Sequence, residues 1–273
     1  MKFLFENWRK YLKEEENVLD LSKELDSGFC DYNPLINEYS QNSPDGLADV
    51  LIFVIGTQQM RWYDVVPKFP ILLRFVHQND GLMTDKNLLN PGEETPHYDF
   101  PGFGQLVMGP RKRAIDYLWK NREGIYSTFK PLFDDYNGSS GLAKEEAMFK
   151  IYLGTLKLPG LGLPKAAFAT QLIIGRLGCI DSINLNIYKG IAKDFNILQS
   201  GDKGFKAPGM TSTARKALQA GVYDSEIIQI TGGGIKLAQK YVQFLKQIAK
   251  MTETSNISRK LWDSWVELVA KKI

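Results

Sequence analysis

The chain has 273 residues, of which 44% are hydrophobic and 24% are charged, and its formal net charge is +3 with a pI near 8.6. This composition excludes an intrinsically disordered chain, and the length suffices for one large domain or for two small lobes. Because the net charge is close to neutral, binding to a nucleic acid would depend on local basic patches.

The few cysteines and histidines exclude several kinds of site. Cys30 and Cys179 are the two cysteines, which is too few for a disulfide framework or for a four-cysteine iron–sulfur cluster, and we therefore expect a reducing compartment, the cytoplasm. His77 and His97 are not spaced as zinc ligands are, so we expect no catalytic metal. No apolar run approaches the roughly 18 residues of a membrane span, and we expect no membrane partner and no signal peptide.

Residues 1–16 carry an amphipathic pattern, since Leu4, Trp8 and Leu12 recur at helical spacing. The pattern favours an ordinary first helix that packs on the body. The triplet from Leu12 to Glu14 also resembles the end of capsid-targeting leaders of phage internal proteins. A phage source would place the protein in the cytoplasm of the host cell.

The next third of the chain alternates loops with helices. Residues 27–49 are rich in Gly, Asn, Ser, Pro and Asp and predict a loop, which runs into helices over residues 47–60 and 63–76. The first of these helices is apolar almost all round and is expected to be buried except at its end. Residues 79–111 predict a long loop, after which three cations, Arg111 to Arg113, open a helix as either a solvated face or a phosphate patch.

A short glycine hairpin joins two helices in the middle of the chain, one over residues 145–156 and one over residues 166–174. Pro159 and Gly160 cannot continue the first helix, and Pro164 suits the first turn of the second. Gly162 permits a close approach to the backbone. At such a place several backbone N–H groups point outward at a helix N-terminus, which is a ready site for a phosphate oxygen.

The hairpin sequence resembles that of a known superfamily. Leu158-Pro159-Gly160-Leu161-Gly162 is similar to the L-P-G-[VIL]-G hairpin of helix-hairpin-helix (HhH-GPD) DNA glycosylases, the superfamily of endonuclease III, MutY and AlkA. Asp181 stands where that family has its aspartate, and the segment ending in Gln58 and Gln59 resembles the helix that lines its base pocket. Taken singly, each landmark has another interpretation: a tight turn, a helix N-cap, or an ordinary amide.

The resemblance implies an all-α fold of two helical lobes with a cleft between them, whereas the residue pattern itself indicates only about ten helices. The whole chain would be a single HhH-glycosylase-like module. The middle lobe would span residues 45–157, and the other would combine residues 1–44 with 158–273. The family's hairpin also binds a monovalent cation through backbone carbonyls. We expect a monomer with no other cofactor, and no iron–sulfur cluster.

The resemblance further implies a monofunctional DNA glycosylase that hydrolyses the N-glycosidic bond of a flipped modified or damaged base in double-stranded DNA. Asp181 would stabilise positive charge at the sugar or activate a water. Gln58 and Gln59 would probe the extruded nucleotide or the gap it leaves. Met60 and Trp62 are candidates for an apolar wedge in the base stack, with core packing as the alternative for Trp62.

Lysine positions decide the subclass and the contacts with the DNA backbone. Bifunctional members carry a nucleophilic lysine two residues after the last hairpin glycine, where this chain has Pro164. Lys165 comes one residue later, a rotation of about 100° around the helix, so we expect no Schiff-base lyase activity. The predicted DNA contacts are the hairpin backbone and four cations: Lys165, Lys203, Lys206 and Arg215.

Two other functions stay open. Where the family often has His and Arg after the aspartate, this chain has Asn184, Asn186 and Lys189, and Gly232 to Gly234 form a possible second anion nest or a plain turn. These features also fit phage enzymes of the alpha-glutamyl/putrescinyl thymidine pyrophosphorylase group, which resemble glycosylases but modify a base without removing it. The other alternative is a DNA-binding protein without catalysis.

Overall fold

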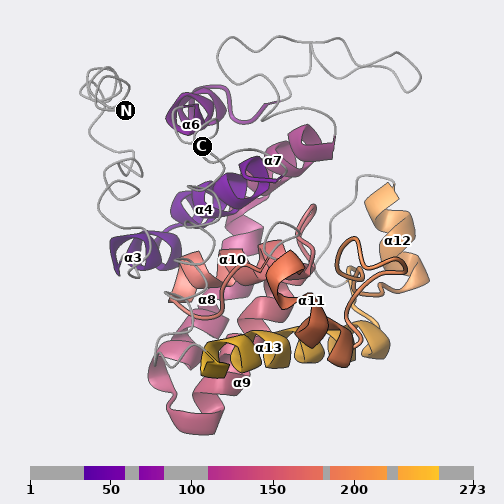
Figure 1. The fold of residues 1–273 in the computed structure, drawn as a ribbon. Helices are drawn as coiled ribbons and strands as arrows, with labels where there is room; N and C mark the ends of the chain where they lie inside the picture. The colour runs from indigo at the N-terminus through magenta and orange to yellow at the C-terminus, as the bar shows by residue number, and fades with distance from the viewer. Residues whose placement is uncertain (1–33, 59–67, 83–109, 181–184, 220–226, 252–273) are drawn as a thin grey trace, which may run out of the picture.

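The computed structural model describes residues 34–58, 68–82, 110–180, 185–219 and 227–251, and every structural statement below concerns these residues. Within them the chain is all helical, as predicted, and its only β-type pairs are two isolated bridges (Figure 1). None of the described helices is long and apolar enough to cross a membrane. The helices are α3 (Pro34–Asn42), α4 (Pro44–Gly56), α6 (Phe69–Gln78), α7 (Pro110–Lys120), α8 (Arg122–Gly138), α9 (Gly141–Leu156), α10 (Leu163–Ile174), α11 (Leu185–Asp194), α12 (Ser212–Gln219) and α13 (Gly232–Met251).

Helix α4 is the centre of the structure. Every residue from Gly46 to Gly56 is buried, and the helix packs against α3, α7, α8 and α10. It begins at Pro44, whose fixed φ suits a first helical turn, and the Ser43 hydroxyl accepts the Gly46 N–H at 2.9 Å. The prediction that this apolar segment forms a buried helix is confirmed.

The predicted loop over residues 27–49 is wrong from residue 34 onward, because α3 and the start of α4 occupy that stretch. Pro and Ser are typical of loops, but Ser also favours the N-cap of a helix and Pro its first turn. Here Ser43 is the N-cap of α4 and Pro44 is in its first turn. Helix α3 also has a structural task. Its Asn37 and Gln41 amides donate to the carbonyls of Leu172 and Ile173 at 2.6 and 2.7 Å, at the C-terminal end of α10 where carbonyls lack helical partners.

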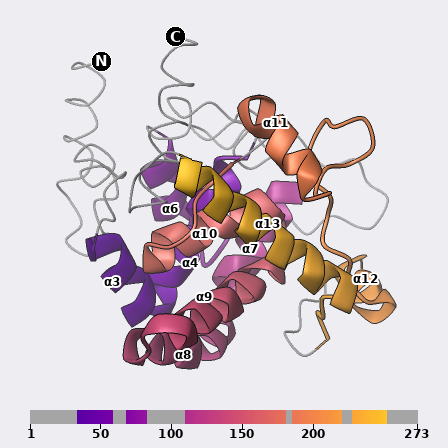
Figure 2. The ribbon, with the colours of Figure 1, turned by 60° about the horizontal axis from the view of Figure 1, so that its bottom comes forward.

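Helix α13 joins the later part of the chain to α9, and the two helices lie side by side in both views (Figures 1 and 2). The ring of Tyr241 on α13 stacks on Tyr152 of α9 with 6.5 Å between centroids. The Tyr241 hydroxyl donates to the carbonyl of Ile180 at 3.0 Å, so α13 also holds the segment that follows α10.

The glycine run from Gly232 to Gly234 is the first turn of α13. The Thr231 hydroxyl accepts the Gly234 N–H at 3.1 Å and so caps the helix. A Cβ on Gly234 would lie 2.6 Å from the carbonyl oxygen of Gly209, and this close approach explains a glycine at that position. The helix expected over residues 1–16, together with Cys30 and His97, lies outside the described residues, and the division into two lobes stays a prediction.

A buried carboxylate ties α4 to its neighbours. Asp49 is fully buried, accepts the Tyr39 hydroxyl at 2.8 Å and lies 2.9 Å from Nε2 of His77. Burial raises the pKa of Asp49 and the pKa of Tyr39. Burial alone would lower the pKa of His77, but the hydrogen bond to Asp49 and its charge outweigh burial and raise it. From the sequence we had considered His77 only as a metal ligand.

These shifts predict how stability changes with pH. A raised pKa in the folded state contributes stability below the ordinary pKa, which is 6.5 for histidine, and the contribution is lost as the pH rises through the raised value. We therefore expect the free energy of unfolding to fall between about pH 6 and about pH 8, measured by urea denaturation. His77→Gln keeps a donor for Asp49 without the charge change, so its stability should vary less over this range; an unchanged slope in this variant would contradict the assignment.

Candidate nucleic-acid interface

The predicted glycine hairpin is present between α9 and α10. Helix α9 ends at Leu156, and backbone bonds from Leu158 to Thr155 (3.1 Å) and from Leu161 to Leu158 (3.4 Å) shape the turn. Pro159 and Leu161 are buried, whereas Gly160 and Gly162 are exposed. The hairpin therefore has an apolar side that faces the core and a glycine side that faces outward.

The two exposed glycines serve different purposes. Gly160 has a φ of +76°, a conformation that favours glycine, and a Cβ there would lie 2.9 Å from Cδ1 of Ile55 on α4. Gly162 is the N-cap of α10 with a φ of −82°, and no atom lies within 4 Å of an added Cβ. Glycine at 160 is thus required by packing within the chain, whereas the space above Gly162 is open to a partner.

Gln58 meets the hairpin directly, although 102 residues separate them in sequence. Its side-chain Nε2 donates to the carbonyl oxygen of Gly160 at 2.5 Å. The hairpin and the segment that ends in Gln58, two of the landmarks of the resemblance, are therefore in contact, and Gln58 stabilises the turn. The bond to Gly160 leaves a second N–H and the oxygen acceptor of this amide for other partners. The expected contact between Gln58 and a nucleotide stays a prediction.

Lys165 points from the first turn of α10 toward the end of α4. Its Nζ lies 3.2 Å from the hydroxyl oxygen and 3.5 Å from the carbonyl oxygen of Thr57, and 5.5 Å from the ring centre of Phe168. The side chain is half-buried. The ammonium group thus lies beside the C-terminal end of α4, within the same small region as Gln58.

The first turn of α7 also lies at the hairpin, a juxtaposition that the sequence analysis missed. A Cβ on Gly160 would be 3.7 Å from the Cβ of Ala114, the residue that follows the three cations. Arg113 is exposed, and burial lowers the pKa of half-buried Arg111 and Lys112. The choice between a solvated face and a phosphate patch for this basic triplet stays a prediction.

The hairpin carbonyls are compatible with the cation that the resemblance implies. The carbonyl of Leu158 accepts the Leu161 N–H, and that of Gly160 accepts Gln58, which uses one lone pair of each oxygen. In the described part of the chain no three His, Cys, Asp or Glu side chains gather as metal ligands. Backbone carbonyls are thus the oxygen ligands available at the hairpin, and the cation stays a prediction.

Other predicted site residues are not at the hairpin or are not described. Lys206 bonds to the backbone and side-chain oxygens of Asn196 at 2.9 and 2.7 Å, while Lys203 and Arg215 are exposed. Among the described residues, none of these three cations forms a hydrogen bond or ion pair with the hairpin. The remaining predicted site residues lie outside the described residues: Gln59, Met60, Trp62 and Asp181.

No protein-family model, curated protein or solved structure matches this chain.

The contrast between the two glycines gives a matched test of the hairpin packing. Gly160→Ala places a methyl group against Ile55 and strains a positive φ, so it should destabilise the fold by about 1–3 kcal/mol. Gly162→Ala meets neither obstacle, and only the weaker N-cap preference applies to it. Urea denaturation of both variants measures the difference, and equal stabilities would show that the hairpin is not held against α4 as described.

Proposed function

We propose that this protein is a DNA-binding base-excision enzyme, a monofunctional DNA glycosylase on a two-lobed HhH-GPD-like fold. The observation that carries the proposal is the hairpin itself. Its turn is fastened to α4 through Gln58 and Ile55, and its exposed glycine side leads directly into the N-terminus of α10. A sequence that resembles a DNA-binding hairpin thus adopts the geometry that binding to a phosphate requires.

The N-terminus of α10 supplies donors and positive charge. The first N–H groups of a helix have no helical partner, and the helix dipole adds partial positive charge there. Gly162 has no side chain to cover these groups. Leu163 is buried and Pro164 contributes no N–H, which leaves the backbone N–H groups of Gly162 and Lys165. Arg113, on the neighbouring first turn of α7, adds an exposed cation.

In the proposed base excision, the hairpin holds the DNA backbone beside an extruded nucleotide. Extrusion costs a few kcal/mol, which contacts to the neighbouring phosphates offset. Asp181, ionised, stabilises positive charge that develops at C1′ as the base leaves, or removes a proton from the attacking water. Pro164 stands at the family's lysine position, and Lys165 lies beside Thr57, so neither residue supplies the nucleophilic amine that strand cleavage requires. The product is therefore an abasic site in an intact strand.

A charge placed at Gly162 tests the phosphate contact. Gly162→Asp should fold normally, since Asp is a favoured N-cap residue and the added side chain has open space. Its carboxylate would repel a phosphate at the same position, and we expect at least a tenfold loss of duplex affinity, about 1.4 kcal/mol. The measurement is fluorescence anisotropy with a short duplex over a series of salt concentrations.

Gly162→Asn is the matched control, because asparagine has nearly the same shape and is an equally good N-cap without the charge. Its side-chain oxygen covers the same N–H groups, so it should lose part of the duplex affinity but less than Gly162→Asp, and the difference between the two variants isolates the charge. For the wild type we expect a shallow salt dependence, a slope of only a few units, because amide contacts release few counterions. If the Asp variant bound as tightly as the Asn variant at every salt concentration, the hairpin would be a structural turn only.

A second substitution tests the reaction. Asp181→Asn should abolish excision and leave duplex binding unchanged, with activity scored as abasic product from a panel of duplexes that carry different modified bases. Mass analysis of the same DNA separates excision from base modification, since a modifying enzyme would yield a heavier base and no abasic site. Full excision by the Asn variant would remove Asp181 from the mechanism.

A further inference from the structure

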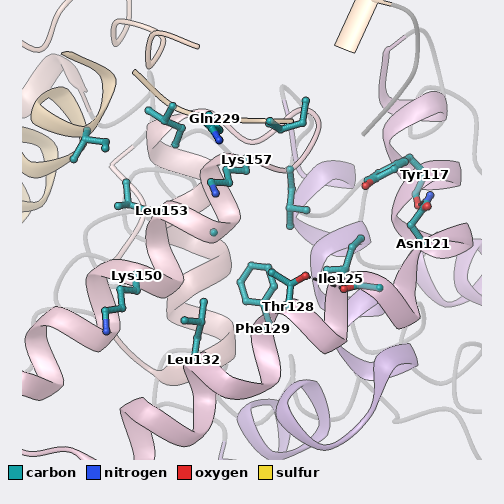
Figure 3. A pocket seen from close by; sticks show the side chains of 16 residues that line it. Tyr117, Asn121, Ile125, Thr128, Phe129, Leu132, Lys150, Leu153, Lys157 and Gln229 are labelled. Carbon is teal, nitrogen blue, oxygen red and sulfur yellow. Dashed lines mark hydrogen bonds between the residues drawn. The ribbon is translucent and has the colours of Figure 1, made fainter. Parts of the chain in front are cut away.

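An open groove of about 760 Å³ lies beside the hairpin (Figure 3). Helices α7, α8 and α9 and the segment from Ile228 to Ile235 enclose it. Leu158 and Lys157, the first residues of the hairpin, belong to its wall. The groove therefore shares Leu158 with the hairpin to which we assign the DNA backbone.

The shape of the groove depends on a close approach of α8 and α9. A Cβ on Gly154 would lie 2.9 Å from the ring of Phe129, so glycine lets this ring pack directly on α9. Phe129, Ile125, Ile228 and Ile230 are buried and form an apolar base. Gly124, on the α8 side, leaves the opposite wall open, with no atom within 4 Å of an added Cβ.

The charged groups of the groove are all cationic. Lys150 and Lys157 line one wall from α9, and no Asp or Glu is among the described residues that line it. Lys150 is paired with Asp135 at 3.1 Å, whereas Lys157 forms no salt bridge with a carboxylate in the described ranges. Asn121 and Gln229 bring side-chain amides to the rim, and amides can donate to and accept from a base edge.

We infer that this groove binds a nucleoside phosphate unit, with the base against the apolar wall and the phosphate at Lys157. The size lies within the range of ligand sites, and the mixture of apolar walls with a few polar groups is typical of them. An apolar ligand would leave Lys157 without a counter-charge, and a cationic amine would be repelled by it. The choice of a nucleotide rests on the proposed DNA function.

Two sources could supply such a unit: an unpaired nucleotide of the DNA held at the hairpin, or a free nucleotide. Three probes distinguish them by calorimetric titration of the full chain: thymidine, thymidine monophosphate and a single-stranded thymidine tetranucleotide. We expect the tetranucleotide to bind at least tenfold more tightly than the monophosphate, and thymidine to bind most weakly. Equal affinity for the monophosphate and the tetranucleotide would identify a free nucleotide as the ligand.

The groove can be filled without disturbing the fold. Gly124→Leu adds a side chain within α8 where nothing obstructs it, and leucine favours the helix over glycine. It should weaken binding of the tetranucleotide at least tenfold. Gly138→Leu is the matched control at the other end of α8, where an added Cβ also meets no atom and the groove is not reached, and it should bind as wild type does. Lys157→Gln should weaken the monophosphate several-fold and leave thymidine unchanged.

The same variants separate this inference from the proposed function. Gly124→Leu should leave the affinity for a fully paired, unmodified duplex unchanged, because no nucleotide then enters the groove, whereas Gly162→Asp should reduce it. If wild type bound the duplex but neither the monophosphate nor the tetranucleotide, the groove inference would be overturned and the hairpin proposal would stand. Equal loss in the two leucine variants, or equal affinity of Lys157→Gln and wild type for the monophosphate, would also overturn it.

Discussion

The structure depends on the contact between the hairpin and the C-terminal end of α4. Gly160 has a backbone conformation that a side chain would disfavour, and it lies close to Ile55, while its carbonyl accepts the Gln58 amide. Lys165 approaches the same end of α4 through Thr57. A turn held from two sides keeps the start of α10 in one orientation, and a helix N-terminus binds an anion well only when its N–H groups are already arranged.

The position of α4 extends this constraint to the rest of the molecule. As the helix is buried along most of its length, α3, α7, α8 and α10 are all placed relative to it. Packing of α7 on α4 brings Ala114, which follows the basic triplet, close to Gly160 of the hairpin. The groove lined by α7, α8 and α9 then lies next to the same turn, so one central helix determines the spacing between the candidate phosphate site and the candidate nucleotide site.

Burial of α4 has a cost at Asp49, the buried acidic residue of this helix. A carboxylate without water is strongly disfavoured unless it is paired, and Tyr39 and His77 provide that pairing from α3 and α6. The arrangement makes the central helix sensitive to protonation while the hairpin contacts are made by backbone, amide and ammonium groups. Stability and binding to a phosphate therefore depend on pH through different groups.

The sequence by itself determined the helical class, the buried helix before Gln58 and the hairpin with its two flanking helices. These features depend on local periodicity and on the backbone limits of Pro and Gly, which act over a few residues. The start of α4 was mispredicted because Pro and Ser serve both loops and helix starts. Only the tertiary structure decided that Gln58 bonds to Gly160, that Ala114 of α7 lies close to the hairpin, and that a groove with Lys157 on its wall adjoins it. Those relations join residues far apart in the chain, and they arise from how the helices pack on α4, which no local pattern encodes.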